Sequence, residues 1–311
     1  MGSLSRFGLM FEPQEGMPPD ELLGWAEYAE KSGYGHVFRS DHLLPTSKKP
    51  GLSSLECWST LGAIAVKTRR IEFGPMVSPI GFRNPALLAR MACTVHSLSK
   101  GRLRLGVGAG WYGEEYLSHG YEFPDIGVRQ AQFREALQII APLVRGERVD
   151  FDGRHFSAHT DALPKPRSPI HLIIGGRGRR TVRAAADFGD EWNAYSPSLG
   201  LFRSLKTLLD SRARRRVEVS QMAPFVIAEN STDLEARVKR FMRRRGASGS
   251  VQSYLKELKA NSGVIAGTAD GFVSQLNERI ELGIEKFYFQ VLDTSDRQPE
   301  DLLTDTLRTR L

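Results

Sequence analysis

Cysteine is nearly absent from this chain, because Cys57 and Cys93 are the only two among 311 residues. Two cysteines are too few for a disulfide framework, and their spacing does not match that of metal ligands. The sequence also contains no HExxH pattern and no cluster of cysteine with histidine. We therefore expect no bound metal.

Long apolar runs are absent as well. No stretch approaches the ~20 apolar residues that a membrane-spanning helix needs. Residues 1–16 lack a basic segment followed by a sustained apolar one, so no secretory signal is expected. Hydrophobic residues nevertheless make up 41% of the chain and charged residues 25%, which excludes a disordered or fibrous protein. We expect a cytoplasmic globular protein that has no membrane partner.

Acidic residues are outnumbered, with 36 aspartates and glutamates against 43 lysines and arginines and a formal net charge of +7. The basic excess gathers in two runs, at 212–216 and 237–245. Aromatic residues are not interleaved with these runs, as a groove for single-stranded nucleic acid requires. We therefore expect solvated helix faces and disfavour a nucleic-acid partner. A non-enzymatic nucleic-acid-binding or flavin-binding protein is the remote alternative.

Short β-rich runs alternate with amphipathic stretches along the chain. Strands are expected at 6–11, 36–39, 71–76, 102–107, 170–174, 191–195, 222–228 and 286–291. Helices are expected at 18–31, 55–67, 85–98, 128–145, 181–188, 201–215, 232–245, 249–260 and 269–282. A short apolar piece stands at 264–266. The segment 147–169 interrupts the alternation, and its Asp152-Gly153 pair indicates a β-hairpin.

This order predicts an α/β fold, a (β/α)8 TIM barrel with an insertion around residues 147–169. A doubly wound parallel sheet is the alternative. No linker or change of composition divides the chain, so we expect one barrel domain over residues 1–311.

The carboxyl ends of barrel strands carry the active site, which reduces the sequence to a few candidates. The second strand runs into Asp41 and His42, and an imidazole beside a carboxylate can move a proton near neutral pH. In the alternative reading, Asp41 caps a turn and His42 only packs. Glu12 and Tyr195 follow the first and sixth strands and are candidates for contacting substrate.

Two glycine-rich turns also follow strands. The turn at 106–110 is one residue too short for a dinucleotide fingerprint, but its glycines allow a flat ring to approach the backbone. The turn at 173–181 combines glycines, arginines and the start of a helix, which suits a phosphate; a tight loop with exposed arginines is the alternative. Trp111 and Tyr112 are candidates for a substrate wall, and the long loop at 43–54 is a candidate lid.

Several stretches, taken in order, resemble the luciferase-like monooxygenase superfamily and especially its branch that uses the deazaflavin coenzyme F420. The resemblance rests on FRSDHL at 38–43, NPALLARMACTVHSLSKGRLRLGVGAGWYGEEY at 84–116, PIHLIIGGRG at 169–178 and GTADGFVSQLNERIELGIEKFYF at 267–289. It covers nearly the whole chain.

The resemblance implies a barrel with an insertion and a set of cofactor contacts. The ring lies over a bulge at Pro75, Met76 and Val77, where the family often has a non-prolyl cis peptide. Its edge is bordered by Gly108, Ala109 and Gly110, and its phosphate is held by Gly175, Gly176, Arg177 and Gly178. His42 lies near the reacting carbon, with Asp41 orienting it. A homodimer, and a flavin or F420 reductase that supplies reduced cofactor, are the expected protein partners.

Two positions depart from the related sugar-phosphate dehydrogenases. Trp111 stands where those enzymes carry an acid after the glycine turn, and residues 197–199 replace a lysine beyond the sixth strand. Both changes argue against a phosphorylated sugar as substrate. The resemblance therefore implies hydride transfer between F420 and a small organic substrate, with a two-component monooxygenase that uses reduced FMN as the alternative.

Overall fold

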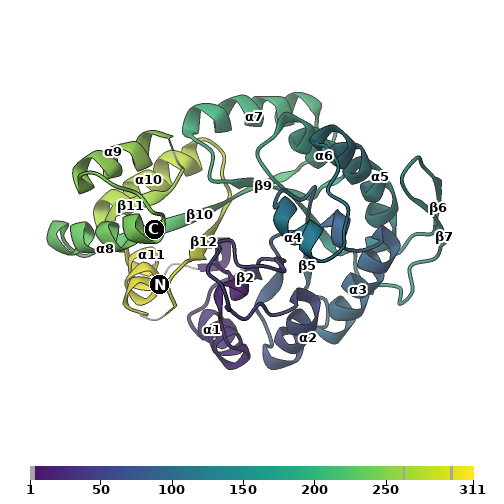
Figure 1. Cartoon of the computed structure of the whole chain (residues 1–311), viewed down its shortest axis with the longest axis horizontal. Helices are drawn as coiled ribbons and strands as arrows, with labels where there is room; N and C mark the ends of the chain where they lie inside the picture. Colours follow the sequence, from purple (N-terminus) through teal and green to yellow (C-terminus); the bar gives the residue numbers. More distant parts are fainter. Residues whose placement is uncertain (1–3, 262, 295–296) are drawn as a thin grey trace.

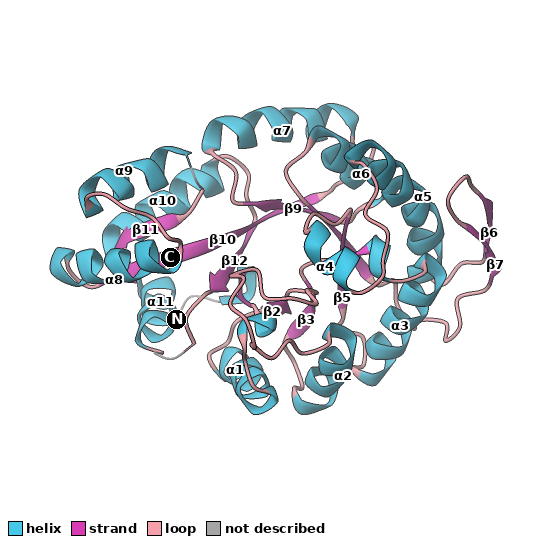
Figure 2. Ribbon diagram, in the orientation of Figure 1, coloured by secondary structure: helices cyan, strands magenta, loops and turns pink. Residues whose placement is uncertain are grey.

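A ring of parallel strands surrounded by helices makes up the molecule (Figure 2). The computed structural model describes residues 4–261, 263–294 and 297–311. The barrel strands are β1 (Phe7–Phe11), β2 (His36–Arg39), β3 (Glu72–Pro75), β5 (Arg104–Gly108), β8 (His171–Gly175), β9 (Glu191–Tyr195), β10 (Glu218–Ala228) and β12 (Lys286–Val291). Two short strands, β4 (Ser78–Pro79) and β11 (Ile265–Thr268), extend the sheet.

The hydrogen-bonded order of the strands is β3-β2-β1-β12-β10-β9-β8-β5-β4, with β11 attached to β10. A parallel bridge between Phe73 and Leu103 then joins β3 to the segment that enters β5. The sheet thus returns to its starting edge. This nearly closed ring confirms the predicted TIM-barrel fold and excludes the doubly wound alternative, whose sheet has two free edges.

Eleven helices follow in the described residues: α1 (Pro19–Lys31), α2 (Cys57–Lys67), α3 (Pro85–Leu98), α4 (Gly113–Ser118), α5 (Ile126–Val144), α6 (Arg179–Phe188), α7 (Leu199–Arg212), α8 (Ser231–Arg244), α9 (Val251–Asn261), α10 (Ala269–Glu281) and α11 (Gln298–Arg310). Side chains that cap the first turn explain where two of these helices begin. Asn84 accepts hydrogen bonds from the first N–H groups of α3, and Glu56 accepts one from Ser59 in α2. The sequence analysis missed α4 and α11 and took α4 as part of a loop.

Each barrel strand is buried on both faces because its alternate side chains serve two cores. Leu9 and Phe11 of β1 point outward into the large core shared with the helices. Met10 points inward, where it meets Phe38, Met222 and other interior side chains. This explains why the strands carry apolar residues on both faces rather than on one.

Strand β10 divides the barrel from a smaller appendage. It pairs with β12 as far as Pro224 and Gln290, and its last residues, from Phe225 to Ala228, pair with β11 instead. The two partners therefore fork at the carboxyl end of β10. Buried side chains from α8, α9, β11 and the end of β10 form a separate cluster beyond the fork. Figure 1 shows α8, α9 and β11 at the left of the barrel.

The insertion is a two-stranded antiparallel hairpin, β6 (Val149–Asp152) and β7 (Ser157–Thr160), as the sequence predicted. It projects beside α3 and α5, away from the barrel mouth (Figure 1). Glu135 of α5 holds its turn by accepting hydrogen bonds from the N–H groups of Arg154, His155 and Phe156 at 2.7–3.1 Å. No helix in the described part of the chain has the length and apolar character needed to cross a membrane.

Candidate active site

A cavity of about 370 Å³ opens at the carboxyl ends of the barrel strands. Eleven of the residues singled out in the sequence line it: Glu12, His42, Met76, Val77, Gly108, Ala109, Gly110, Trp111, Gly175, Gly176 and Tyr195. Five others do not: Asp41, Pro75, Tyr112, Arg177 and Gly178. The strand-end rule thus located the cavity, and the detailed contacts decide what each residue can do.

His42 is held at the cavity by an acid that the sequence analysis did not select. Its Nδ1 lies 3.0 Å from Oε1 and 3.1 Å from Oε2 of Glu115, in α4. Glu115 is itself 1% exposed and also accepts a hydrogen bond from the N–H of Leu43 at 3.0 Å. This pair fixes the imidazole and leaves Nε2 as its nitrogen for the cavity.

The role expected of Asp41 was wrong, because its carboxylate is committed elsewhere. It accepts a hydrogen bond from Ser78 Oγ at 2.6 Å and bonds to the guanidinium of Arg83 at 2.7 and 3.3 Å. Trp58 donates to the same Ser78 hydroxyl. Asp41 therefore ties the end of β2 to the segment around β4, while Glu115 takes the place expected of Asp41 beside His42.

The acids around His42 set its protonation. Burial alone would lower the pKa of the imidazole, but the Glu115 hydrogen bond and charge, with smaller contributions from Glu12 and Asp41, raise it above its usual value. The protonated ring is thereby favoured. Such a group suits proton donation to an oxygen near neutral pH.

The wall below His42 is a bulge between β3 and β4. The peptide bond between Met76 and Val77 is cis, as the resemblance implied. The Val77 side chain fits between two glycines: a Cβ on Gly108 would lie 2.7 Å from it, and a Cβ on Gly175 2.6 Å. The glycines of these two strands therefore admit the Val77 side chain. Direct contact of a ring with the backbone of the 106–110 turn, the reading made from the sequence, is not required to explain Gly108.

The proposed phosphate loop follows β8. Gly176 has a φ of +139°, which only glycine adopts without strain, and its N–H is already donated to the carbonyl oxygen of Asn193. The donors that remain belong to the start of α6, where Gly178 precedes Arg179 and no side chain caps the helix. Arg177 is exposed beside this turn. A phosphate would thus be bound by the helix start rather than by Gly176.

Acceptor groups gather on the opposite side of the cavity. Glu12 accepts hydrogen bonds from the side-chain amides of Gln14, at 2.6 Å, and Gln290. Ser40 in turn donates to Gln14 at 2.5 Å. The remaining amide oxygen of Gln290 is buried and has no hydrogen-bond partner in the described structure. A hydrogen-bond donor on a bound molecule would satisfy it.

The aromatic candidates divide into two groups. Trp111 is 66% exposed and meets the His42 ring edge to face, with 5.7 Å between ring centroids. Tyr112 stacks beneath Trp111 and is buried, so it supports the wall rather than forming it, contrary to its selection as a wall residue. The predicted lid reaches the rim through Thr46, whose hydroxyl donates to Glu15 at 2.8 Å.

Sequence reasoning missed Glu115 and gave Gln290 no role. Glu115 lies in a helix of six residues, too short to show a periodic pattern, and its partner is 73 positions away. Gln290 lies within the last expected strand, at 286–291, and was given no role there. The GEEY sequence after the glycine turn was a usable signal, but it does not say which of Glu114 and Glu115 faces inward.

One group of possible metal ligands appears among the described residues: His171, Glu191 and Glu218. It lies at the amino-terminal ends of the strands, opposite the cavity. Lys286 bonds to Glu218 and lies 3.7 Å from Glu191. Because this ammonium already neutralises the carboxylates, the group reads as an ion-pair cluster.

The first basic run is a solvated surface, as expected. Arg212 pairs with Asp187, Arg215 with Asp190, and Arg216 with Glu285. These pairs lie where strands begin, far from the cavity. The second run differs, because part of it lines a groove near Gln290.

Comparison with known proteins gives a consistent picture. The family model for luciferase-like monooxygenases matches residues 2–285. An F420-dependent glucose-6-phosphate dehydrogenase of Beutenbergia cavernae is 36% identical over 179 residues, which cover 57% of this chain and 52% of that protein. One from Nakamurella multipartita is 31% identical over 221 residues, or 68% of this chain and 64% of that protein. The chain thus spans about half to two thirds of these relatives' length.

Solved structures show the same fold. An F420-dependent secondary alcohol dehydrogenase, in complex with an F420-acetone adduct, superposes with a TM-score of 0.81 at 20% identity and covers 98% of each chain. The monooxygenase RslO1 from Streptomyces bottropensis has a TM-score of 0.78 at 20% identity, over 97% of this chain and 96% of that one. The fold is therefore common to proteins of different chemistry, and the site must separate them.

Proposed function

We propose that this chain, which belongs to the luciferase-like monooxygenase family, is an oxidoreductase that moves a hydride between coenzyme F420 and a small organic substrate. The observation that carries the proposal is the His42–Glu115 pair. It places a proton-transfer group on one wall of a cavity whose other wall is the Met76–Val77 bulge. The F420-dependent relatives support the choice of cofactor.

The cavity fits a flat ring that carries a phosphate. Its volume, about 370 Å³, falls in the range typical of small-molecule sites. The Val77 side chain, seated between Gly108 and Gly175, would form a smooth apolar face for the ring. The uncapped start of α6 and Arg177 would hold the phosphate.

The chain's own residues would manage the proton that accompanies the hydride. When bound, the deazaflavin supplies or accepts the hydride. In reduction of a carbonyl, protonated His42 gives the proton from Nε2 to the substrate oxygen; in oxidation of an alcohol, neutral His42 removes it. Glu115 keeps the ring oriented and stabilises its charged form. Trp111 covers the imidazole from the solvent side.

The substrate is expected to differ from a phosphorylated sugar. Trp111 replaces the acid after the glycine turn, and residues 197–199 lack the lysine of those relatives. Glu115 of α4 reaches His42, so an acid is present at the cavity from another position in the chain. A secondary alcohol or the corresponding ketone is the simplest substrate for this arrangement.

Titration of the purified protein with F420 and with FMN, each oxidised and reduced, tests the proposal. We expect saturable binding of F420 and much weaker binding of FMN. Fluorescence and calorimetry measure both. Turnover would then be sought with secondary alcohols and oxidised F420. Tight binding of FMN with oxygen consumption would instead support the two-component monooxygenase.

A further inference from the structure

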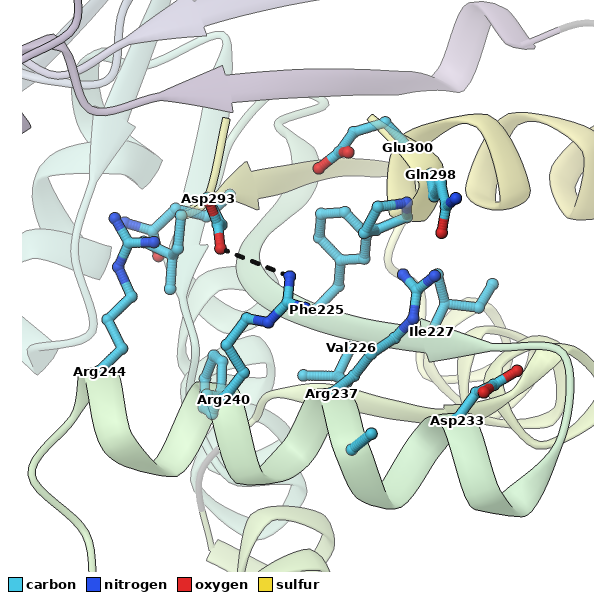
Figure 3. Close-up of a pocket in the computed structure, with 15 residues that line it drawn as sticks. Phe225, Val226, Ile227, Asp233, Arg237, Arg240, Arg244, Asp293, Gln298 and Glu300 are labelled. Carbon is cyan, nitrogen blue, oxygen red and sulfur yellow. Dashed lines mark ion pairs between the residues drawn. The ribbon is translucent and has the colours of Figure 1, made fainter. Parts of the chain in front are cut away.

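The fork between β10 and β12 opens a groove beside the catalytic cavity. Three arginines of α8, Arg237, Arg240 and Arg244, point into it from one side (Figure 3). The facing side is formed by the end of β10, the segment after β12 and the start of α11. The groove has a volume of about 300 Å³, enough for a small organic group.

The spacing of these arginines explains why they share a face. Positions 237, 240 and 244 follow the i, i+3, i+7 pattern of one helix face, whereas Lys239 and Arg243 lie on another part of the surface. The sequence analysis predicted a solvated helix face for this run. Arg240 and Arg244 are exposed and Arg237 is half-buried, but the fork also places a groove against all three.

Two of the three arginines form no ion pair within the described part of the chain. Arg240 faces Asp293 at 3.9 Å. Arg237 and Arg244 form no ion pair with any carboxylate of the described residues, and Nη1 of Arg237 is buried without a hydrogen-bond partner. A buried guanidinium N–H without an acceptor costs free energy, which an oxygen from a ligand would recover.

Acids also line the groove, and their places limit where an anion can bind. Asp233 lies at the amino-terminal end of α8 and receives a hydrogen bond from Asn230 at 2.8 Å. Glu300 lies across the groove on α11 (Figure 3). Arg244 lies at the opposite end of α8 from Asp233. Asp293 faces Arg240 between them, so the guanidinium groups left for an anion are those of Arg237 and Arg244.

The groove and the catalytic cavity are neighbours that share a residue. Gln290 lines both of them, and Arg244 also lines a third hollow together with Glu12 and Tyr195. The free amide oxygen of Gln290 stands at this junction. A molecule that extends from His42 past Gln290 would bring its far end to Arg244.

We propose that the substrate carries an acidic group, a carboxylate or a phosphate, which the Arg237–Arg244 face of the groove binds while the reacting carbon lies beside His42. This inference rests on the proposed function and deepens it by naming a substrate class. Guanidinium groups bind either oxyanion with paired, charge-assisted hydrogen bonds. The two arginines are seven residues apart, or about 10 Å along the helix, so one anion contacts both only through their long side chains.

Binding of two probes, glutarate and inorganic phosphate, tests the groove without cofactor or turnover. Calorimetry on the wild-type protein should show saturable binding of at least one probe, weakened by added salt. The double variant Arg237→Gln/Arg244→Gln should lose about 10-fold or more of this affinity. The double variant Lys239→Gln/Arg243→Gln removes the same charge from the other side of α8 and should bind as the wild type does.

The outcomes are distinct. Equal losses in both double variants, or no binding of either probe to the wild type, would overturn the proposal. A loss of F420 affinity confined to the Arg237→Gln/Arg244→Gln protein would also overturn it, because the groove would then hold the acidic tail of the cofactor. The probe that binds more tightly identifies carboxylate or phosphate.

Steady-state kinetics distinguish a failure of this inference from a failure of the proposed function. Secondary alcohols matched with and without a terminal acid should differ in KM, and the difference should disappear in the Arg237→Gln/Arg244→Gln protein while kcat is kept. If F420 fails to bind but the probes still depend on the two arginines, the proposed function fails and the anion site stands.

Discussion

The two ends of the barrel treat their polar side chains differently. At the amino-terminal end, the buried carboxylate of Glu191 accepts a hydrogen bond from Tyr288 at 2.8 Å and is hydrogen-bonded to His171 at 3.1 Å. It also forms ion pairs with Lys286 and Arg104 at 3.7 Å. At the carboxyl-terminal end, Gln290 leaves an acceptor unpaired and His42 presents a ring nitrogen to a cavity. The first arrangement stabilises the fold, and the second is available to a ligand.

The two ends of the barrel also differ in the protonation of their buried groups. Burial alone would raise the pKa of Glu191, but the hydrogen bond from His171 and the charge of Lys286 lower it to about 2. Around His42 the balance favours the protonated imidazole. One end therefore holds its charge through the ordinary pH range, whereas the other holds a group able to exchange its proton. Substitutions at the two ends should accordingly separate stability from catalysis.

Replacing His42 should have the largest effect on turnover. His42→Asn removes the proton-transfer group, so kcat should fall by about 10²–10⁴-fold while F420 affinity changes little. Steady-state kinetics and a binding titration check this. His159→Asn, on the exposed hairpin, is the control and should leave both quantities unchanged. A near-normal kcat in His42→Asn would show that His42 packs in the site and does not transfer the proton.

Replacing Glu191 should have the largest effect on stability. Glu191→Gln leaves Lys286 and Arg104 near an uncharged amide, but Glu218 and Glu72 still pair with them, so the loss of unfolding free energy should lie below the roughly 3–5 kcal/mol that an orphaned buried charge costs. Denaturant unfolding measures the loss. Asp150→Asn removes an exposed acid and should leave the unfolding free energy nearly unchanged. A loss of F420 affinity in folded Glu191→Gln protein would contradict the division between the two ends.

Acid should destabilise the protein through the same carboxylate. The pKa of Glu191 is about 2 in the folded state and about 4.3 in an unfolded chain, so the unfolded state binds more protons between these values. Its contribution is present above about pH 5 and is lost as the pH falls toward 2, by up to roughly 3 kcal/mol. Unfolding curves across this range should show the fall. The Glu191→Gln protein should show a shallower one.

Most of the fold follows from the sequence, whereas the partners within the site do not. Strands that alternate with helices predict a parallel sheet covered by helices, and eight such units predict a barrel. The pairing of His42 with Glu115 joins residues 73 positions apart, which no local pattern encodes. The spacing of Arg237 and Arg244 is the same whether this helix face meets water or a groove. Only the fork between β10 and β12 places a groove there, and the sequence does not show the fork. The cis peptide at Met76 was expected from the family resemblance alone.

Replacing Glu115 should change the pH dependence more than the maximal rate. Because Glu115 raises the pKa of His42, Glu115→Gln should lower that pKa. Carbonyl reduction needs protonated His42 and is lost as the pH rises through its pKa, so this limb of the kcat profile should move to lower pH. Glu114→Gln alters the adjacent, exposed acid and should leave the limb in place. Identical profiles for the two variants would remove Glu115 from the positioning role.

The smallest effect is expected at the phosphate loop. Arg177 is exposed, and the N–H groups at the start of α6 remain in its absence, so Arg177→Gln should raise the Kd for F420 only a few-fold. The difference should grow at low salt and vanish at high salt. Gly176→Val is a poorer test, because the φ of +139° there strains any other residue. Arg214→Gln, which removes an exposed arginine after α7, is the matched control. If the two arginine variants bind F420 alike at low salt, Arg177 takes no part in binding the cofactor, and only the helix start is left to hold the phosphate.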